Sequence, residues 1–427
     1  MRKQSASSTS LEVRNASCLA TSLGTSARRG RDQGQILRIR HAAIRAEGGR
    51  LTFVGTEKDY AERFAAQPAA HSIDASGKTA IPGLVDAHTH PVWVGDRGEE
   101  IAQRLAGESY ASIAAKGGGI LSTVRATRAA SDEELAGATR KRLARMLSTG
   151  TTTVEAKSGY GLTVDSELRA LRLLQSFSES PDPAPRIVPT LLAAHEVPPE
   201  FTSRRDQWVR VIVEEILRQA AAQRLARFCD VFCDEGAFTV EESRTILEAA
   251  RRLGLGLRIH ADELALSGGA RLAAELGAES ADHLLRIEEA EIGALARSGT
   301  VATLAPGTAW WIRSRQAPAR ALIEAGVPVA VASDSNPGTC HTESLASVAA
   351  HACLDAGLTV DETLTAMTLN GAASLGLAGE VGSLEVGKRA DLVLLDAPDD
   401  RHLVYHWGVN LVAAVVKDGR PIEGLQP

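Results

Sequence analysis

The stretch LVDAHTHPVW, residues 84–93, places two histidines directly after a short apolar run. His88 and His90 are two residues apart, so on an extended strand both side chains point to the same face. Two imidazoles on one face can bind a single cation. A half-buried strand that carries histidines for other reasons has the same spacing, so this motif alone leaves both interpretations open.

The same pattern, an apolar run followed by a polar or small residue, recurs along the middle of the chain. Predicted strands end at 88–90, 157, 195, 234, 260, 283, 305 and 334. Predicted helices lie between them at 131–148, 164–177, 206–224, 240–252, 266–276 and 287–297. Such alternation indicates parallel strands covered by helices, and eight strands predict an α/β fold of the (β/α)8 TIM-barrel type. A doubly wound sheet is the alternative, but its Gly-x-Gly-x-x-Gly fingerprint is missing after the first strand.

The two ends of the chain differ from the middle. They contain short alternating runs next to glycines, such as ILRIRHAAIRA (36–46), LTFVG (51–55) and VAAVVKDGRPI (412–422). Runs of this kind predict small antiparallel strands with tight turns. We therefore predict a disordered tail at 1–10, a composite β-sandwich from 11–81 and 378–427, and a catalytic barrel at 82–377.

Composition excludes several classes of protein. The chain has 427 residues, of which 44% are hydrophobic and 23% charged, as in ordinary globular enzymes. A formal net charge of -6 without a dense basic patch argues against nucleic-acid binding. The apolar runs are too short to span a membrane. Five scattered cysteines, an odd number, favour a reducing cytoplasm over a disulfide framework.

Two further strand ends add the residues of a hydrolytic site. In GLRIHADE (256–263), His260 ends a strand and Glu263 follows in the loop; in VAVASDSNPG (329–338), Asp334 ends another. Asp334 could merely cap a helix. Three histidines and one carboxylate, however, form a metal site that leaves a position for water. His283, in SADHLL (280–285), is placed to move a proton or to orient a ligand.

The stretch TTTVEAKSGYG (151–161) raises a choice between two chemistries. A lysine at a strand end can bridge two metal ions, which would make Lys157 a ligand. The glycines on both sides of Tyr160 would instead let the backbone turn and present its hydroxyl group to a substrate. Because the set of three histidines and Asp334 is complete without Lys157, we predict the second arrangement.

Taken together, these motifs resemble the amidohydrolase superfamily and, within it, the imidazolonepropionase family. The resemblance runs from about 82 to 339 and rests on PGLVDAHTH, GGGILSTVRATRAAS, KSGYGL, AAHEVPPE, IHADE, ADHL and SDSNPGT. KSGYGL and the AHxVPPE pattern are specific to that family, whereas HTH marks only the superfamily. Ala87, Pro91 and Ser335 depart from the usual family pattern.

The resemblance implies a metal-dependent barrel with a β-sandwich from both termini, and it assigns roles to residues. Implied metal ligands, for one Zn²⁺ or Fe³⁺ per subunit, are His88, His90, His260 and Asp334. Implied substrate contacts are Arg97, Tyr160, His195, Glu263, Asn336, Gly338 and Thr339. Glu263, His283 and Asp334 are the implied proton-transfer residues. The implied substrate is 4-imidazolone-5-propanoate, and the implied assembly is a homodimer in the cytoplasm.

Three other functions stay open at the level of sequence. A hydantoinase or dihydroorotase-like enzyme would open a cyclic amide with a carbamylated lysine between two metals, and Lys157 is the candidate. A deaminase of the same superfamily would share the single-metal ligand set. A non-catalytic binding barrel would retain the fold without turnover, which the intact ligand set argues against. Measuring whether the chain binds one metal ion or two separates the hydantoinase-like function from the other two functions.

Overall fold

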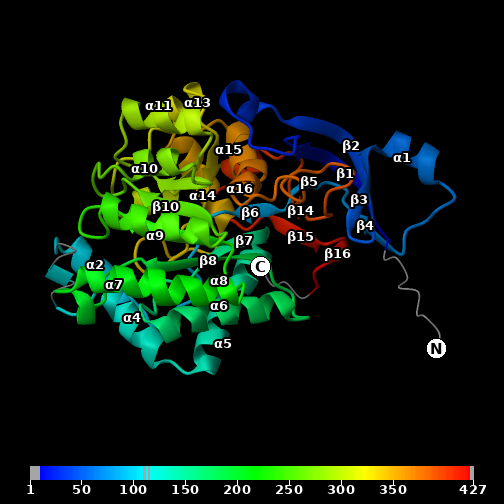
Figure 1. Cartoon of the computed structure of the whole chain (residues 1–427). Helices are drawn as coiled ribbons and strands as arrows, with labels where there is room; N and C mark the ends of the chain where they lie inside the picture. The colour runs from blue at the N-terminus through cyan, green and yellow to red at the C-terminus, as the bar shows by residue number, and fades with distance from the viewer. Residues whose placement is uncertain (1–9, 109–111, 114–115, 424–427) are drawn as a thin grey trace.

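The computed structural model describes residues 10–108, 112–113 and 116–423. Figure 1 shows a helix-covered barrel on one side and a smaller β-rich part on the other. In the β-rich part, the first strands of the chain lie beside the last ones. No helix within the described ranges combines the length and the apolar character that crossing a membrane requires.

Eight parallel strands form the barrel, and they are neighbours in the order of the sequence. They are β6 (Leu84–Asp86), β7 (Thr151–Lys157), β8 (Arg186–Ala194), β9 (Phe228–Cys233), β10 (Gly256–Ala261), β11 (Ser280–His283), β12 (Val301–Leu304) and β13 (Val329–Val331). This arrangement confirms the predicted (β/α)8 fold class.

The barrel closes where its first and last strands meet, beyond their regular ends. The amide of His90 donates to the carbonyl of Ser335 (2.9 Å), and the amide of Asp334 donates to that of His88 (3.0 Å). Thr89 and Ser335 pair as an isolated parallel bridge. The two histidines therefore lie past β6 rather than on it, and β13 ends three residues before Asp334, unlike the prediction. The closing seam itself carries three predicted metal ligands.

Helices cover the outside of the barrel. The longer ones are α2 (Gly98–Leu105), α4 (Ile120–Ala129), α5 (Asp132–Ser148), α6 (Val164–Glu179), α9 (Val240–Arg252), α10 (Gly269–Leu276), α11 (Glu289–Ser298) and α14 (Leu345–Leu354). Shorter ones are α7 (Arg205–Val211), α8 (Leu217–Ala222), α12 (Pro306–Trp311), α13 (Ala319–Glu324), α15 (Val360–Ala366), α16 (Leu369–Ser374) and α17 (His402–Tyr405), with 3₁₀ turns at Gly30–Gly34 and Pro199–Phe201.

Helix boundaries follow local chemistry. Ser131 and Thr239 cap α5 and α9 through reciprocal bonds with glutamates three residues on, which fixes starts close to the predicted ones. The predicted helix at 266–276 begins later, because Gly268 adopts a left-handed φ of 87°. The predicted helix at 206–224 contains a π turn at Ile212–Ile216 between α7 and α8.

The smaller part is one eight-stranded sheet built from both ends of the chain. It contains β1 (Ser10–Thr21), β2 (Leu37–Glu47), β3 (Arg50–Thr56), β4 (His71–Asp74), β5 (Thr79–Pro82), β14 (Leu392–Leu395), β15 (Val412–Lys417) and β16 (Arg420–Pro421), with helix α1 (Glu57–Phe64) beside it. β14 pairs antiparallel with β5, which joins the C-terminal strands to the N-terminal ones. The proposed domain boundaries after 81 and 377 stay a prediction, and the proposed tail at 1–10 lies outside the described residues except for Ser10.

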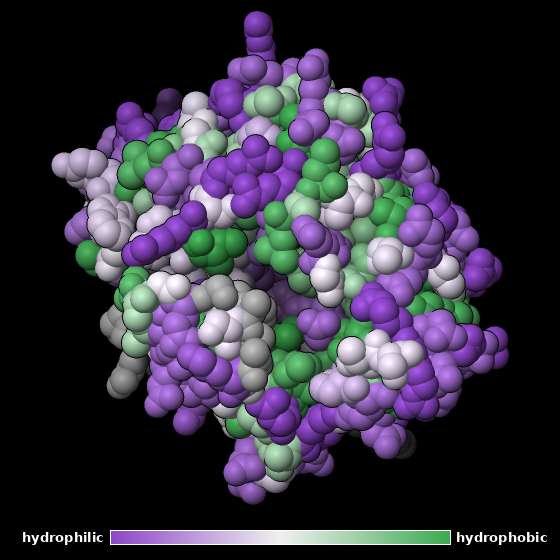
Figure 2. Space-filling view, turned by 90° about the vertical axis from the view of Figure 1, so that its left-hand side faces the viewer, coloured by the Kyte–Doolittle hydropathy of each residue, from purple (hydrophilic) through white to green (hydrophobic). Residues whose placement is uncertain are grey.

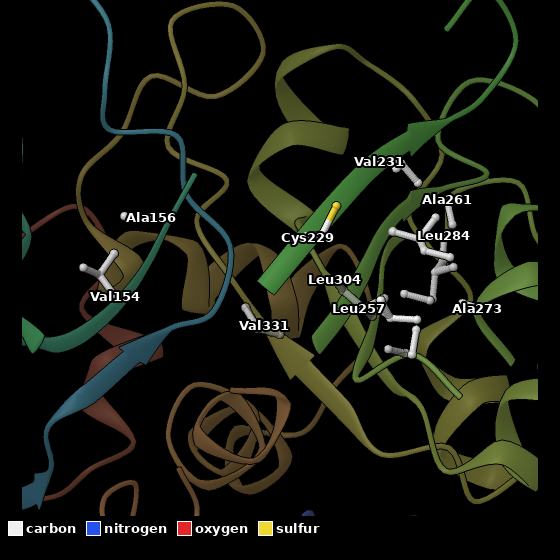
Figure 3. Packing of buried hydrophobic residues seen from close by; sticks show 14 of the residues in the cluster. Val154, Ala156, Cys229, Val231, Leu257, Ala261, Ala273, Leu284, Leu304 and Val331 are labelled. Atoms are coloured by element: carbon white, nitrogen blue, oxygen red, sulfur yellow. The ribbon is translucent and has the colours of Figure 1, made fainter. Parts of the chain in front are cut away.

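Apolar side chains fill the layer between strands and helices. Leu257 of β10, Ala273 of α10 and Leu284 after β11 lie together in this layer (Figure 3). Each is at most 3% exposed. Burying a leucine side chain stabilises the fold by about 1.5–3 kcal/mol, so many such contacts hold the strand ends in fixed positions. The polar side chains at those ends are therefore presented on a rigid support.

Candidate metal centre and active site

A cavity of about 1390 Å³ opens where the barrel strands end. Figure 2 shows the hollowed centre of this face, with hydrophilic residues in its depth. In a (β/α)8 barrel the carboxyl ends of the strands are where active sites form. The cavity is therefore the expected location of the predicted site residues.

The four predicted metal ligands meet at the base of this cavity. The Nε2 atom of His90 lies 3.2 Å from that of His88 and 3.4 Å from that of His260. Asp334 Oδ1 lies 3.5 Å from His88 Nε2 and 3.4 Å from His90 Nε2. All four side chains are buried. His90, His260 and Asp334 line the cavity, and His88 lies behind them.

These distances match the spacing of ligands around one ion. Nitrogen or oxygen ligands at about 2.0–2.1 Å from a tetrahedral centre lie about 3.3–3.4 Å from one another. The hydroxyl group of Thr308 donates to Asp334 Oδ2 (2.7 Å), which leaves Oδ1 directed at the histidines. The residues present fit a divalent metal ion.

Two carboxylates behind the histidines fix their orientation, and the sequence pattern did not single out either one. Asp282 Oδ2 lies 2.6 Å from His88 Nδ1, and Asp230 Oδ2 lies 3.0 Å from His260 Nδ1. A carboxylate at Nδ1 favours the proton there, so the lone pair of Nε2 faces the metal position. Burial opposes the charge of Asp230, yet His260 and Lys157 beside it hold its pKa well below the usual range.

Lys157 lies among the carboxylates of this buried layer. Its ammonium group donates to Asp230 Oδ2 (2.7 Å) and Glu155 Oε1 (2.8 Å), and it lies 4.0 Å from Asp282 Oδ2. The side chain is 0% exposed. Burial alone would lower the pKa of Lys157, but the neighbouring carboxylates raise it above its ordinary value. The lysine is thus held as a cation.

The surroundings of Lys157 oppose a role as a bridge between two metal ions. Carbamylation would turn the ammonium into an anion surrounded by three buried carboxylates, which is electrostatically unfavourable. His88, Asp230 and Asp282 could otherwise hold a second cation, but the ammonium of Lys157 already occupies their neighbourhood. The ammonium of Lys157 thus lies where a second cation would have to bind.

All the residues predicted to contact the substrate or to move protons line the same cavity. They are Arg97, Tyr160, His195, Glu263, His283, Asp334, Asn336, Gly338 and Thr339. The structure therefore brings together the whole predicted set, from the ends of six different strands and the loops that follow them, next to the ligand cluster.

Glu263 and His283 lie next to each other on the cavity wall. His283 Nδ1 lies 3.9 Å from Glu263 Oε1, and neither ring nitrogen of His283 has a hydrogen-bond partner among the described residues. Burial raises the pKa of Glu263. The loop of Glu263 is held by Asp234, whose carboxylate accepts from the amides of Glu263 (2.7 Å) and Leu264 (2.8 Å). The pair can exchange a proton with a bound molecule.

His195 and Tyr160 form another wall. The ring of His195 stacks on that of His90, with centroids 5.2 Å apart, and lies 5.3 Å from the Tyr160 ring. His195 Nδ1 lies 3.0 Å from the Gly159 carbonyl, so Nδ1 carries the proton and Nε2 is an acceptor. Burial lowers the pKa of His195 well below its ordinary value, which keeps the ring neutral.

Arg97 and Asn336, which are also predicted to contact the substrate, form hydrogen bonds with other residues of the protein. Arg97 pairs with both carboxylate oxygens of Glu100, at 3.0 and 2.9 Å. Asn336 donates to the Asp334 carbonyl (2.7 Å) and accepts from the amides of Gly338 and Thr339, both at 2.8 Å. Asn336 thus shapes the loop that follows the metal ligand.

Comparison with known proteins agrees with this geometry. The profile described as "Amidohydrolase family" matches residues 79–422. Imidazolonepropionase from Symbiobacterium thermophilum is 48% identical over 92% of this chain and 93% of its own. That from Shouchella clausii is 47% identical over 92% of this chain and 87% of its own.

Solved structures share the fold at lower identity. An adenosine deaminase from Xanthomonas campestris with bound zinc has a TM-score of 0.72 at 22% identity, covering 96% of this chain and 92% of its own. A triazine hydrolase variant has a TM-score of 0.71 at 18% identity, covering 98% and 96%. At these identities the likeness establishes the fold alone, whereas the profile match and the curated relatives establish that the chain belongs to the amidohydrolase family and, within it, to the imidazolonepropionases.

Proposed function

We propose that this chain hydrolyses the ring amide C–N bond of 4-imidazolone-5-propanoate to give N-formimidoyl-L-glutamate, the third step of histidine degradation. The observation that carries the proposal is the single-metal ligand cluster, which shares one cavity with every residue predicted to contact the substrate. Hydrolysis of a cyclic amide needs activated water, a proton for the leaving nitrogen and groups that hold the ring.

One Zn²⁺ or Fe³⁺ per subunit is the proposed cofactor, held by His88, His90, His260 and Asp334. Imidazole and carboxylate ligands accept both metals. Such an ion supplies Lewis acidity, which activates water for attack on the ring carbonyl. The paired ammonium of Lys157 supports one ion rather than two.

Side chains of the protein would bind the ring and transfer the protons. His195 Nε2 and the Tyr160 hydroxyl would hold the ring heteroatoms against the wall of the cavity. His283 would accept a proton from the attacking water. The carbonyl carbon gains the water oxygen, its bond to nitrogen breaks, and Glu263 would deliver a proton to that nitrogen. The raised pKa of Glu263 suits this role because the group can hold a proton closer to neutral pH.

The whole proposal is tested with purified protein loaded with zinc or iron. Consumption of the imidazolone is followed by its ultraviolet absorbance, and metal per chain is measured by elemental analysis. We expect turnover with one ion per chain. Protein that binds one ion and leaves the imidazolone unchanged would contradict the proposed function. Two ions per chain would favour the hydantoinase-like alternative.

Tyr160→Phe tests the substrate wall separately from the metal. Loss of one hydroxyl bond to the ring is expected to lower kcat/KM by about 10- to 100-fold. Metal content is expected to stay at one ion per chain, because Tyr160 is not among the ligands. Tyr405→Phe is the matched control, since Tyr405 is 81% exposed and does not line the cavity. Metal loss in the Tyr160 variant would reopen the assignment of the ligands.

A homodimer in the cytoplasm completes the proposal. The five cysteines are free, which is in keeping with a reducing compartment. The mass of the protein in solution, measured by light scattering, tests the dimer.

A further inference from the structure

Arg104 is a second arginine on the wall of the cavity, and neither the sequence motifs nor the family resemblance assigns it a role. It lies in α2, seven residues after Arg97, so about two helical turns separate the two residues. Both line the cavity.

The charges of the two arginines are not equally available. Arg97 is bound by both oxygens of Glu100, and the two side chains are 6% and 8% exposed. This buried pair is neutral as a unit. Arg104 Nη2 donates to the Gly338 carbonyl (2.8 Å), and among the residues that the structure describes no carboxylate lies within 4.0 Å of its guanidinium. Arg104 therefore brings to the cavity a positive charge that is not held in a close ion pair.

Both guanidinium groups meet at Gly338. A Cβ atom at this position would overlap Arg97 Nη1, so the absence of a side chain lets the guanidinium approach the backbone. Arg104 contacts the carbonyl of the same residue. Gly338 follows the metal ligand Asp334 by four residues in a loop that Asn336 holds together. An anion bound here would thus lie at a fixed offset from the ligand cluster.

The rest of the lining carries several acidic groups. Six acidic residues face the cavity: Glu108, Glu196, Glu235, Glu263, Asp334 and Asp355. Two of them have partners, since Glu108 pairs with Lys116 and Asp355 pairs with His351. The others oppose the binding of an anionic ligand, so a guanidinium outside a close ion pair favours such a ligand at this end of the cavity. Arg313 also lines the cavity, but it is exposed and lies after α12, away from the Gly338 loop in sequence.

We propose that Arg104 is the specificity-determining residue that binds the propionate carboxylate of the substrate, with the Arg97–Glu100 pair as its neighbour. The inference rests on the proposed function. A guanidinium has five N–H donors, so Arg104 can keep its bond to Gly338 and still donate to a carboxylate. The N–H groups of Arg97, in its neutral pair with Glu100, would orient the carboxylate, and Arg104 would supply the net positive charge.

The test compares two variants with two substrates. Arg104→Met is expected to raise KM for 4-imidazolone-5-propanoate by about 10- to 100-fold, with kcat changed only a few-fold. For the corresponding propanamide, which lacks the charge, Arg104→Met is expected to leave KM nearly unchanged. Arg313→Met is the matched control and is expected to change KM for neither compound. Arg104→Gln, which keeps a donor for the Gly338 carbonyl, replaces the methionine variant if that one does not fold.

Several results would overturn the inference. One is an equal rise in KM for acid and amide, which would mean that Arg104 only shapes the loop. Another is an equal effect of the two arginine variants, which would mean a general electrostatic attraction. A binding measurement does not depend on turnover: calorimetry with N-formimidoyl-L-glutamate should show about 10- to 100-fold weaker binding to Arg104→Met. Absence of imidazolone turnover by the unaltered protein would instead contradict the proposed function.

Discussion

Asp334→Asn is expected to lower kcat/KM for the imidazolone by about 1,000-fold or more and to deplete the protein of metal. The carboxylate is the only anionic member of the proposed ligand set. Its Oδ1 atom lies 3.4 Å from His90 Nε2 and 3.5 Å from His88 Nε2, so it contributes both a ligand and charge. An asparagine keeps the shape but not the charge. Elemental analysis and steady-state kinetics measure the two effects.

A second aspartate on the cavity wall provides the control. Asp355 lines the cavity, but it directly follows α14 and pairs with His351 at 2.7 Å. Asp355→Asn is expected to keep one ion per chain and a kcat/KM within a few-fold of the original. Full metal content with full activity in Asp334→Asn would remove Asp334 from the ligand set. Equal losses in both variants would point to a general effect of cavity charge.

The residues that end strands could be predicted from the sequence because their position has a simple signature. A polar side chain after a buried apolar run marks the mouth of a barrel, and His88, His260 and Asp334 all follow that rule. The convergence of His88 with Asp334 follows from barrel closure, which brings the first and last strand ends together, and His260 reaches them from β10. Hydrogen bonds between residues 88–90 and 334–335 close the barrel at this seam.

The supporting residues could not be found in the same way. Asp230 and Glu155 lie within their strands, in FCDVFC and TTTVEAK, where they interrupt the apolar pattern. Such interruptions have many causes in a single sequence. The pairing of β9 with β10 brings Asp230 behind His260, and Glu155 of β7 is linked to Asp230 through Lys157. The sequence does carry one signal for them. An acidic residue inside a strand that is otherwise apolar is buried, and a buried carboxylate needs a partner.

Arginines illustrate a second limit. The family resemblance implies that Arg97 contacts the substrate, and Arg97 does line the cavity. Its pairing with Glu100, three residues later, shows that its charge is already offset. Arg104 has the sequence context of an ordinary surface residue on a helix. Whether an arginine is free depends on its three-dimensional neighbours, and these cannot be read from spacing alone.

Lys157→Met is expected to lower the free energy of unfolding by about 3–5 kcal/mol. The substitution removes the cation from contact with Glu155 and Asp230, and all three side chains are 0% exposed. Two buried carboxylates then lose their common partner. Arg258 compensates only in part, since its Nε lies 3.9 Å from Glu155 Oε1. Denaturant unfolding monitored by circular dichroism gives the free energy.

Lys157→Met combined with Glu155→Gln separates charge from packing. The glutamine removes one of the uncompensated charges, and its oxygen can still accept from the Thr89 amide, as Glu155 Oε2 does at 3.2 Å. The double variant is therefore expected to be more stable than Lys157→Met alone. If the lysine acted as a carbamylated bridge, the single variant would lose a metal ion instead, and Glu155→Gln would restore nothing. Equal stability of the single and double variants would mean that lost packing, not charge, makes Lys157 important.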